Sequence, residues 1–209
     1  MELLNFYWDT EANGLEHEDS EGNPPADKFW CINLEDDNGV TYDFILDGYE
    51  EGDVKPVSLF AETMEEVFRK LNGEGIIPVL IASNQYGYDL PMLNKLLGIH
   101  YSFTSFISPD IRVGYKDTLD LSQSLWPDRP MPKGCPHVIP NPVTGKNKKV
   151  GPHGLESWGY RVANAKPSVH DWRNGEPAFY MHRCKEDRKI TKLTYLALMQ
   201  EMNNNRMSN

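Results

Sequence analysis

The sequence has no long hydrophobic run, and its cysteines are few and scattered. No apolar run reaches the roughly 18 residues that a membrane-spanning helix requires, so no membrane contact is expected. The three cysteines, Cys31, Cys135 and Cys184, are odd in number and far apart, which is typical of reduced thiols. The opening segment MELLNFYWDTE has an acidic second residue and no basic stretch before an apolar core, which argues against a secretory signal. We therefore expect a cytoplasmic protein.

Basic residues are also fewer than acidic residues. Lys and Arg number 21 against 31 Asp and Glu, which gives a formal net charge of −10. Tight non-specific binding of DNA normally requires a basic surface, so this balance disfavours a protein that binds nucleic acid by charge alone. It does not disfavour an enzyme that holds a chain end through metal ions. Acidic composition also commonly serves solubility alone.

The 209 residues, 39% of them hydrophobic, are typical of one globular domain. Strand patterns come first and then alternate with helix patterns, which predicts an α/β domain with a mixed central sheet flanked by helices. The expected strands cover residues 1–10, 29–34, 40–46, 76–84 and 113–117. The expected helices cover residues 58–73, 90–97, 118–125, 154–162 and 177–202. Residues 1–203 would form the domain, and residues 204–209 a frayed tail.

Residues 127–152 form a segment of unusual composition within that domain. The segment holds seven prolines, three glycines and five basic residues against one Asp. A stretch of this length without periodicity is typical of a functional loop or of a mobile insertion. Its basic residues are Arg129, Lys133, Lys146, Lys148 and Lys149. They could follow a single-stranded nucleic-acid backbone or simply be solvated, and the sequence leaves both open.

The first candidate site is Asp9-Thr-Glu11, at the end of the apolar strand that opens the chain. Residues two apart in a strand point to the same face, so both carboxylates can aim at one point. Two unit charges about 4 Å apart repel by roughly 4 kcal/mol at an effective dielectric of about 20, so a partly buried pair needs a cation, a bound proton, or an Arg or Lys. Hard divalent ions, Mg²⁺ or Mn²⁺, suit oxygen ligands. The pattern alone is unspecific, and a solvated strand end is the alternative.

Three more acidic residues occupy comparable positions. Asp89 follows the strand that ends at Asn84, and Asp117 follows the next strand along the chain. Ligand sites of α/β sheets favour such carboxyl ends of strands, although each residue could instead only cap the helix that follows it. Asp187 lies on the long C-terminal helix, opposite its apolar stripe, where a solvated surface acid is the alternative.

In their order along the chain, these motifs resemble the DEDD superfamily of metal-dependent 3′–5′ exonucleases. The similarity is greatest to the proofreading domain of family A phage DNA polymerases. Asp9-Thr-Glu11 is similar to the first motif, Asn84-x-x-x-Tyr88-Asp89 to the second, and Asp187 to the carboxylate of the third. Asp117-Thr-Leu and the segment HGLESWGYRV at residues 153–162 extend the resemblance, which runs from about residue 5 to residue 196.

The resemblance implies a ribonuclease H-like fold and hydrolysis of phosphodiester bonds with two divalent cations, Mg²⁺ or Mn²⁺. It implies that Asp9, Glu11 and Asp187 bind one ion. Asp9 would bridge to the second ion, which Asp89 would hold largely through water. Among the substrate-binding residues, Asn84 would contact the terminal nucleotide and Leu15 would wedge between the last two bases. Tyr88 and Arg183 complete the substrate-binding set that we expect.

The chain departs from the family where a general base is expected. One subclass places Tyr four residues before the last Asp, and the other places His five residues before it. The polymerase domains that the chain resembles belong to the Tyr subclass, but here these positions hold Arg183 and His182, so the Tyr is missing and the spacing fits the His subclass. The ordinary pKa of His, near 6.5, suits a general base, and we expect His182 to serve as one. On a straight helix, however, position i−5 lies well around from i, so the alternative is a surface His182 with Arg183 on a phosphate.

The expected function is therefore a 3′–5′ exonuclease that acts on single-stranded or frayed DNA 3′ ends and releases nucleoside 5′-monophosphates. The chain could be a stand-alone proofreading subunit, with a separate DNA polymerase as its partner, in the host cytoplasm if it is encoded by a phage. Two alternatives remain open. One is an RNA-degrading exonuclease of the same fold, and the other is a catalytically idle module that binds a polymerase or a nucleic-acid end.

Overall fold

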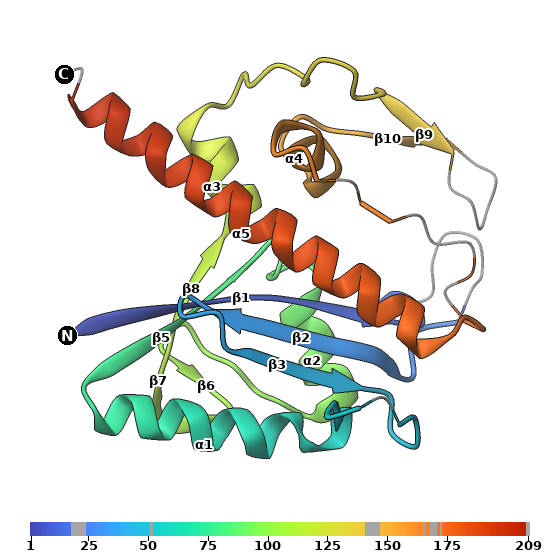
Figure 1. Cartoon of the computed structure of the whole chain (residues 1–209), viewed down its shortest axis with the longest axis vertical. Coiled ribbons are helices and arrows are strands. Elements are labelled where there is room, and N and C mark those ends of the chain that lie inside the picture. Colours follow the sequence, from blue (N-terminus) through green and yellow to red (C-terminus); the bar gives the residue numbers. More distant parts are fainter. Residues whose placement is uncertain are drawn as a thin grey trace.

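The computed structural model forms an α/β domain around one mixed sheet (Figure 1). It describes residues 1–17, 24–50, 52–140, 147–164, 166–167, 171 and 173–207. The central sheet has six strands in the order β4-β3-β2-β1-β5-β8. The six strands are β1 (Glu2–Ala12), β2 (Phe29–Asp36), β3 (Thr41–Ile45), β4 (Lys55–Pro56), β5 (Ile76–Ala82) and β8 (Gly114–Asp117).

The long strand β1 lies in the middle of the sheet and organises it. β1 pairs antiparallel with β2 on one side and parallel with β5 on the other. The tight turn between β2 and β3 contains Gly39, whose φ of 81° glycine adopts without strain. Because β5 and β8 also run parallel to β1, the carboxyl ends of three strands lie at one edge of the sheet.

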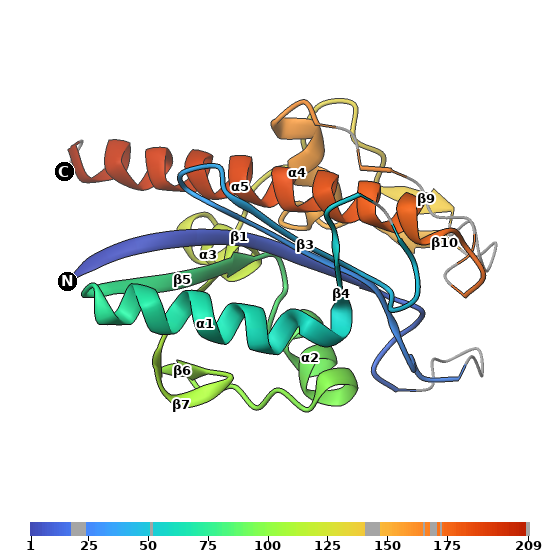
Figure 2. The same cartoon turned by 60° about the horizontal axis from the view of Figure 1, so that its bottom comes forward.

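Helices cover both faces of the sheet (Figure 2). The 3₁₀ helix η1 (Val57–Leu59) leads into α1 (Phe60–Gly73), which packs with α2 (Asp89–Leu97) on one face. The long helix α5 (Pro177–Met207) crosses the other face and contacts both β1 and β2. Even-numbered β1 residues such as Phe6 and Trp8 belong to the core under α1, whereas Tyr7 packs against Tyr195 of α5. The alternation of the strand therefore aims Asp9 and Glu11 at α5.

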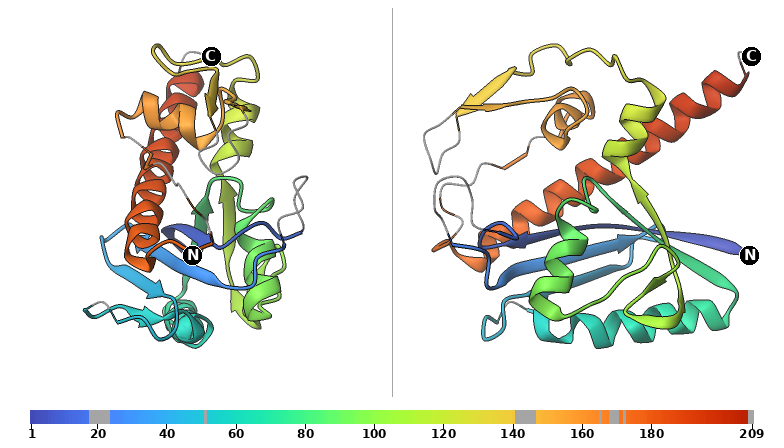
Figure 3. Two further views of the ribbon diagram at one scale, coloured as in Figure 1. Left: turned by 90° about the vertical axis from the view of Figure 1, so that its right-hand side faces the viewer. Right: turned by 180° about the vertical axis from the view of Figure 1, so that it is seen from behind.

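A smaller group of elements lies beyond α5, on the side away from α1 (Figures 1 and 3). It comprises α3 (Thr118–Leu125), α4 (Leu155–Arg161) and the hairpin of β9 (Val138–Pro140) and β10 (Asn147–Lys149). Trp158 of α4 is buried against Ile190 and Leu198 of α5, which fastens this group to the long helix. Arg129 reinforces the contact through an ion pair of 2.6 Å with Glu201.

The expected α/β class with a mixed sheet and flanking helices is confirmed, and two details differ. The C-terminal helix continues to Met207 instead of ending near residue 202, so residues 204–207 are helical and 208–209 lie outside the described part. Two short hairpins were not expected, β9–β10 within residues 127–152 and β6 (Ser105–Phe106) with β7 (Ser108–Arg112). Strands of two to five residues leave too little alternation to be recognised from sequence. Among the described helices, none combines the length and apolar character that a bilayer span requires.

Replacing Phe68 by Ala tests the packing beneath α1. The Phe68 ring is fully buried, with its centroid 5.2 Å from that of Phe6, so its removal leaves a cavity between helix and sheet. We expect the free energy of unfolding, from urea denaturation, to fall by about 3–5 kcal/mol. Phe103, which is 85% exposed, is the matched control. Phe103→Ala should change that free energy by less than about 0.5 kcal/mol, and equal losses in both variants would contradict this packing.

Candidate metal centre

Two distant parts of the chain bring three carboxylates together. Asp9 and Glu11 are two residues apart on β1 and face α5, where Asp187 lies. One oxygen from each of these residues lies within 4.8 Å of the other two. The thiol of Cys184, three residues before Asp187, donates a hydrogen bond of 3.1 Å to the backbone carbonyl of Asp9. This hydrogen bond holds α5 against β1 next to the three carboxylates.

Asp89 reaches the same place from the opposite face of the sheet. It is the first residue of α2, and its Oδ1 accepts hydrogen bonds from the backbone N–H of Thr10 at 3.1 Å and from the Thr10 hydroxyl at 2.8 Å. Because Thr10 lies between Asp9 and Glu11, these bonds fix Asp89 beside the other two acids. The alternative interpretation, in which Asp89 only caps its helix, does not hold, since the N-cap position belongs to Tyr88.

Two carboxylate oxygens at this place are buried without a hydrogen-bond partner among the described residues. They are Oδ2 of Asp9 and Oδ1 of Asp187. An unsatisfied buried oxygen is unfavourable by about 1–3 kcal/mol, and by more when it carries charge. A hard divalent cation binds carboxylate oxygens of this kind. The donor set of Asp9, Glu11 and Asp187 therefore fits Mg²⁺ or Mn²⁺, and Asp89 lines the same cavity.

Burial shifts the ionisation of these acids. Loss of hydration raises the pKa of Glu11 from 4.5 to about 7, although the Arg183 charge lowers it. Burial likewise raises the pKa of Asp89 from 3.8 to about 7, against the hydrogen bonds from Thr10. The pKa of Asp9 lies well above 3.8, because of burial first and then of the neighbouring Cys184 and Asp187. Without a cation, the folded chain thus retains protons at neutral pH that a solvated carboxylate would release.

Two basic side chains partly compensate the acids. The Nε atom of Arg183 donates to Oε1 of Glu11 at 2.6 Å, and its Nη2 lies 3.5 Å from Oδ2 of Asp187. The Lys166 ammonium lies 2.6 Å from the same Asp187 oxygen. Arg183 was expected at the substrate, whereas Lys166 was not anticipated. Lys166 is 21 residues away from Asp187 in an irregular stretch, so no spacing rule connects the two residues.

The four acids open into a cavity of about 810 Å³, which lies in the usual size range of ligand pockets. Its wall combines the carboxylates with four basic side chains, although the whole chain carries a net charge of −10. The basic residues are Lys148, Lys166, Arg173 and Arg183. Lys148 comes from β10, so part of the proline-rich segment does border the site. The cavity therefore offers both cation-binding and anion-binding groups within one space.

His182 is not brought to this site. It is exposed on α5 and absent from the described residues that line the cavity, so the expectation of His182 as general base is wrong for this arrangement. The reason is the start of α5 at Pro177, which makes the helix continuous through both positions. Position i−4, Arg183, then shares the face of Asp187, and position i−5 turns away.

All four expected substrate residues, Leu15, Asn84, Tyr88 and Arg183, line the cavity. Leu15 is 54% exposed, so its apolar side chain is available to a ligand. Asn84 adopts a φ of 65°, and its amide lies over Gly87, where any Cβ would come within 2.6 Å of the Asn84 Oδ1. The Tyr88 hydroxyl donates to the carbonyl of Gly14 at 3.3 Å, which ties the second motif to the loop that carries Leu15.

Other candidate residues have structural roles. Asp117 caps α3 by accepting from the backbone N–H of Leu119 at 2.9 Å, as its alternative interpretation proposed. Arg129 is buried, and its guanidinium lies over the rings of Trp126 and Trp158, so it is not available to nucleic acid. Lys133 and Lys149 are exposed, while Lys146 lies outside the described residues.

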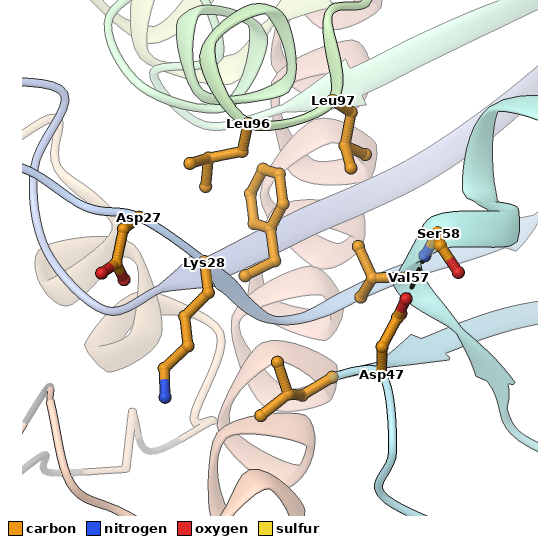
Figure 4. Close-up of a pocket in the computed structure, with 9 residues that line it drawn as sticks. Asp27, Lys28, Asp47, Val57, Ser58, Leu96 and Leu97 are labelled. Carbon is orange, nitrogen blue, oxygen red and sulfur yellow. Dashed lines mark hydrogen bonds between the residues drawn. The ribbon is translucent and has the colours of Figure 1, made fainter.

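A second, smaller hollow of about 160 Å³ lies near the start of β2 (Figure 4). Its wall is mainly apolar and includes Val57, Leu96 and Leu97. The polar Asp47 at its edge accepts a hydrogen bond from the backbone N–H of Ser58 at 3.0 Å, so its carboxylate supports η1. The described lining of this hollow offers no group of acids comparable to that of the large cavity.

Comparison with known proteins adds no family assignment. No protein-family model matches the chain, and no curated protein matches it.

The raised pKa values of Glu11 and Asp89 predict how the stability of the metal-free protein depends on pH. Between about pH 4.5 and pH 7, the folded state keeps protons that the unfolded chain has released, so the free energy of unfolding falls as pH rises through this window. Urea denaturation with a chelator present, at several pH values from 5 to about 7.5, measures this fall. Asp89→Asn should reduce it, because Asn does not ionise.

The exposed Asp120 on α3 provides the matched control. In Asp120→Asn, the free energy of unfolding should fall with rising pH by as much as it does in the unmodified protein. Identical pH dependence in the unmodified protein and in Asp89→Asn would show that Asp89 ionises normally, contrary to the burial argument.

Proposed function

We propose that this chain is a metal-dependent 3′–5′ exonuclease with a ribonuclease H-like fold. It acts on single-stranded or frayed DNA 3′ ends and releases nucleoside 5′-monophosphates. The observation that carries the proposal is the meeting of four acids from β1, α2 and α5 in one cavity, with two buried carboxylate oxygens that have no described partner. The same four residues match the carboxylates in the sequence motifs of the exonuclease family.

The architecture supports the same proposal. A mixed sheet with β1 between the antiparallel β2 and the parallel β5, covered by α1 and α5, is compatible with a ribonuclease H-like domain. In such a domain the first acids lie on the central strand and the last acid lies on the C-terminal helix. Asp9, Glu11 and Asp187 occupy these places here.

In the proposed reaction, Asp9, Glu11 and Asp187 would hold one divalent ion, and in the two-ion arrangement that the resemblance implies Asp89 would contribute to a second. A bound divalent ion lowers the pKa of water and stabilises negative charge that develops on phosphate and on the leaving oxygen. The protein keeps the four carboxylates close together through the Thr10 and Cys184 hydrogen bonds, before any ligand binds. Water attacks the terminal phosphodiester, and the 3′ oxygen of the penultimate nucleotide leaves with a proton.

The residues that line the cavity also suit the substrate. Leu15 offers an exposed apolar side chain for the bases, and Asn84 offers an amide for hydrogen bonds to the last nucleotide. Lys148 and Arg173 supply positive charge at the wall for the phosphate backbone. Arg183 does not act as a general base, because a guanidinium stays protonated in proteins. A separate DNA polymerase is the partner that a stand-alone proofreading subunit of this kind would serve.

One observation favours a second candidate function. Arg183 occupies the position at which the resemblance expects Tyr, and the exposed His182 does not replace it. A module that binds a nucleic-acid end without cleaving it would tolerate this change. The four clustered acids favour the enzyme, because their mutual repulsion serves no purpose in a module that binds no metal.

Degradation of 5′-labelled single-stranded DNA in Mg²⁺ or Mn²⁺ tests the proposal. We expect a ladder that shortens from the 3′ end. Asp9→Ala should lower the rate by more than about 100-fold, since loss of even an outer-shell partner of a metal costs about 10- to 100-fold. His182→Ala should retain nearly the full rate, because its side chain is exposed away from the cavity.

The control for this assay is Asp120→Asn, which lies outside the cavity lining. A parallel RNA substrate separates the two nuclease alternatives. If the unmodified protein cleaves neither DNA nor RNA but still retains a labelled strand, the binding module is the correct function and the nuclease is excluded.

A further inference from the structure

We propose that Arg183 and Lys166 are built-in counter-ions that take the place of one divalent cation, so that this site binds a single metal ion. The inference rests on the proposed metal centre and makes it more specific. It concerns the feature in which this chain departs from the family, a basic residue where a neutral Tyr is expected.

The partners of the individual carboxylate oxygens carry the argument. Arg183 donates to Oε1 of Glu11, and Lys166 lies 2.6 Å from Oδ2 of Asp187. Oδ1 of Asp89 accepts two hydrogen bonds from Thr10. The buried oxygens that have no described partner are Oδ2 of Asp9 and Oδ1 of Asp187. The protein's own donors therefore already occupy Oε1 of Glu11, Oδ2 of Asp187 and Oδ1 of Asp89, while the two buried oxygens without a described partner offer a place for one ion.

The net charge of the acid cluster also indicates that the site binds one metal ion. Four ionised carboxylates carry a charge of −4, and the Arg183 and Lys166 side chains contribute +2. The remainder, −2, is neutralised by one divalent cation. A second divalent ion would give the site an excess positive charge before substrate arrives, in surroundings where burial makes unbalanced charge unfavourable.

The counter-ions are also held firmly in place. The Arg183 side chain is nearly buried, and besides its acidic partners it donates to the backbone carbonyl of Pro167. Arg183 is on α5, whereas Lys166 comes from the segment before that helix, so the two cations approach the acids from separate parts of the chain. A second ion would have to compete with both side chains for Glu11 and Asp187.

Binding of Mn²⁺ to the metal-free full chain at neutral pH tests the inference. The loss of the free-ion signal in electron paramagnetic resonance gives the number of ions bound per chain. We expect one ion for the unmodified protein. The double variant Lys166→Gln with Arg183→Gln should bind two, because the competing charges are gone.

The matched control uses Lys185 and Arg188, neighbours on the same helix. Lys185 pairs with Asp43 at 2.6 Å and Arg188 with Glu35 at 2.6 Å, both outside the cavity lining. The double variant Lys185→Gln with Arg188→Gln should still bind one ion. Lys166→Gln alone, which removes the more exposed of the two cations, covers the case in which the double variant does not fold. It should bind a second ion at least about 10-fold more tightly than the unmodified protein does.

The outcomes separate this inference from the proposed function. Two ions on the unmodified chain would overturn the inference and leave the metal centre intact. One ion on the unmodified chain and on both folded cavity variants would show that Arg183 and Lys166 do not set the number. No bound ion on the unmodified chain would overturn the metal centre itself, and with it the proposed nuclease.

Discussion

The repulsion among four clustered acids, of which Asp9 is half-buried and the other three are buried, is the constraint on which the rest of this structure depends. Asp9, Glu11, Asp89 and Asp187 border one cavity, and burial raises the pKa of Glu11 and Asp89 to about 7. Such a cluster persists in a folded protein only when other interactions hold it together. Here these are the Thr10 hydrogen bonds, the Cys184 contact with β1 and the two basic side chains. A bound divalent cation would relieve the repulsion that remains, which ties the stability of the domain to the proposed function.

The fold supplies the acids from rigid elements rather than from mobile loops. The pairing of β1 with β2 includes Asp9 and Glu11, so these side chains have fixed directions, and α5 presents Asp187 from a helix of 31 residues. α2 starts at Asp89, immediately behind the turn that Asn84 and Gly87 shape. The lining of the cavity changes from acidic at the end of β1 to basic at β10 and around Lys166. This division of charge suits a site that holds both a cation and a phosphate.

Much of this arrangement could be predicted from sequence because it follows local rules. The alternation of β1 and the order of strands and helices predicted the mixed sheet, whereas the four acids that line the cavity were selected by the family resemblance. The role of His182 was mispredicted because it depends on where α5 begins, and a continuous helix from Pro177 turns that residue outward. Lys166 could not be foreseen, since its contact with Asp187 depends on how an irregular segment folds back onto the helix.

The most direct test of the metal centre is a crystal structure of the chain soaked in Mn²⁺, with the anomalous scattering of manganese recorded. The account predicts an anomalous peak bounded by Oδ2 of Asp9 and Oδ1 of Asp187, the two buried oxygens without a described partner. The same crystals of Asp187→Asn should show a much weaker peak. If the crystals contain manganese peaks elsewhere but none at these two oxygens, the result would contradict the claim that the acids form a metal site.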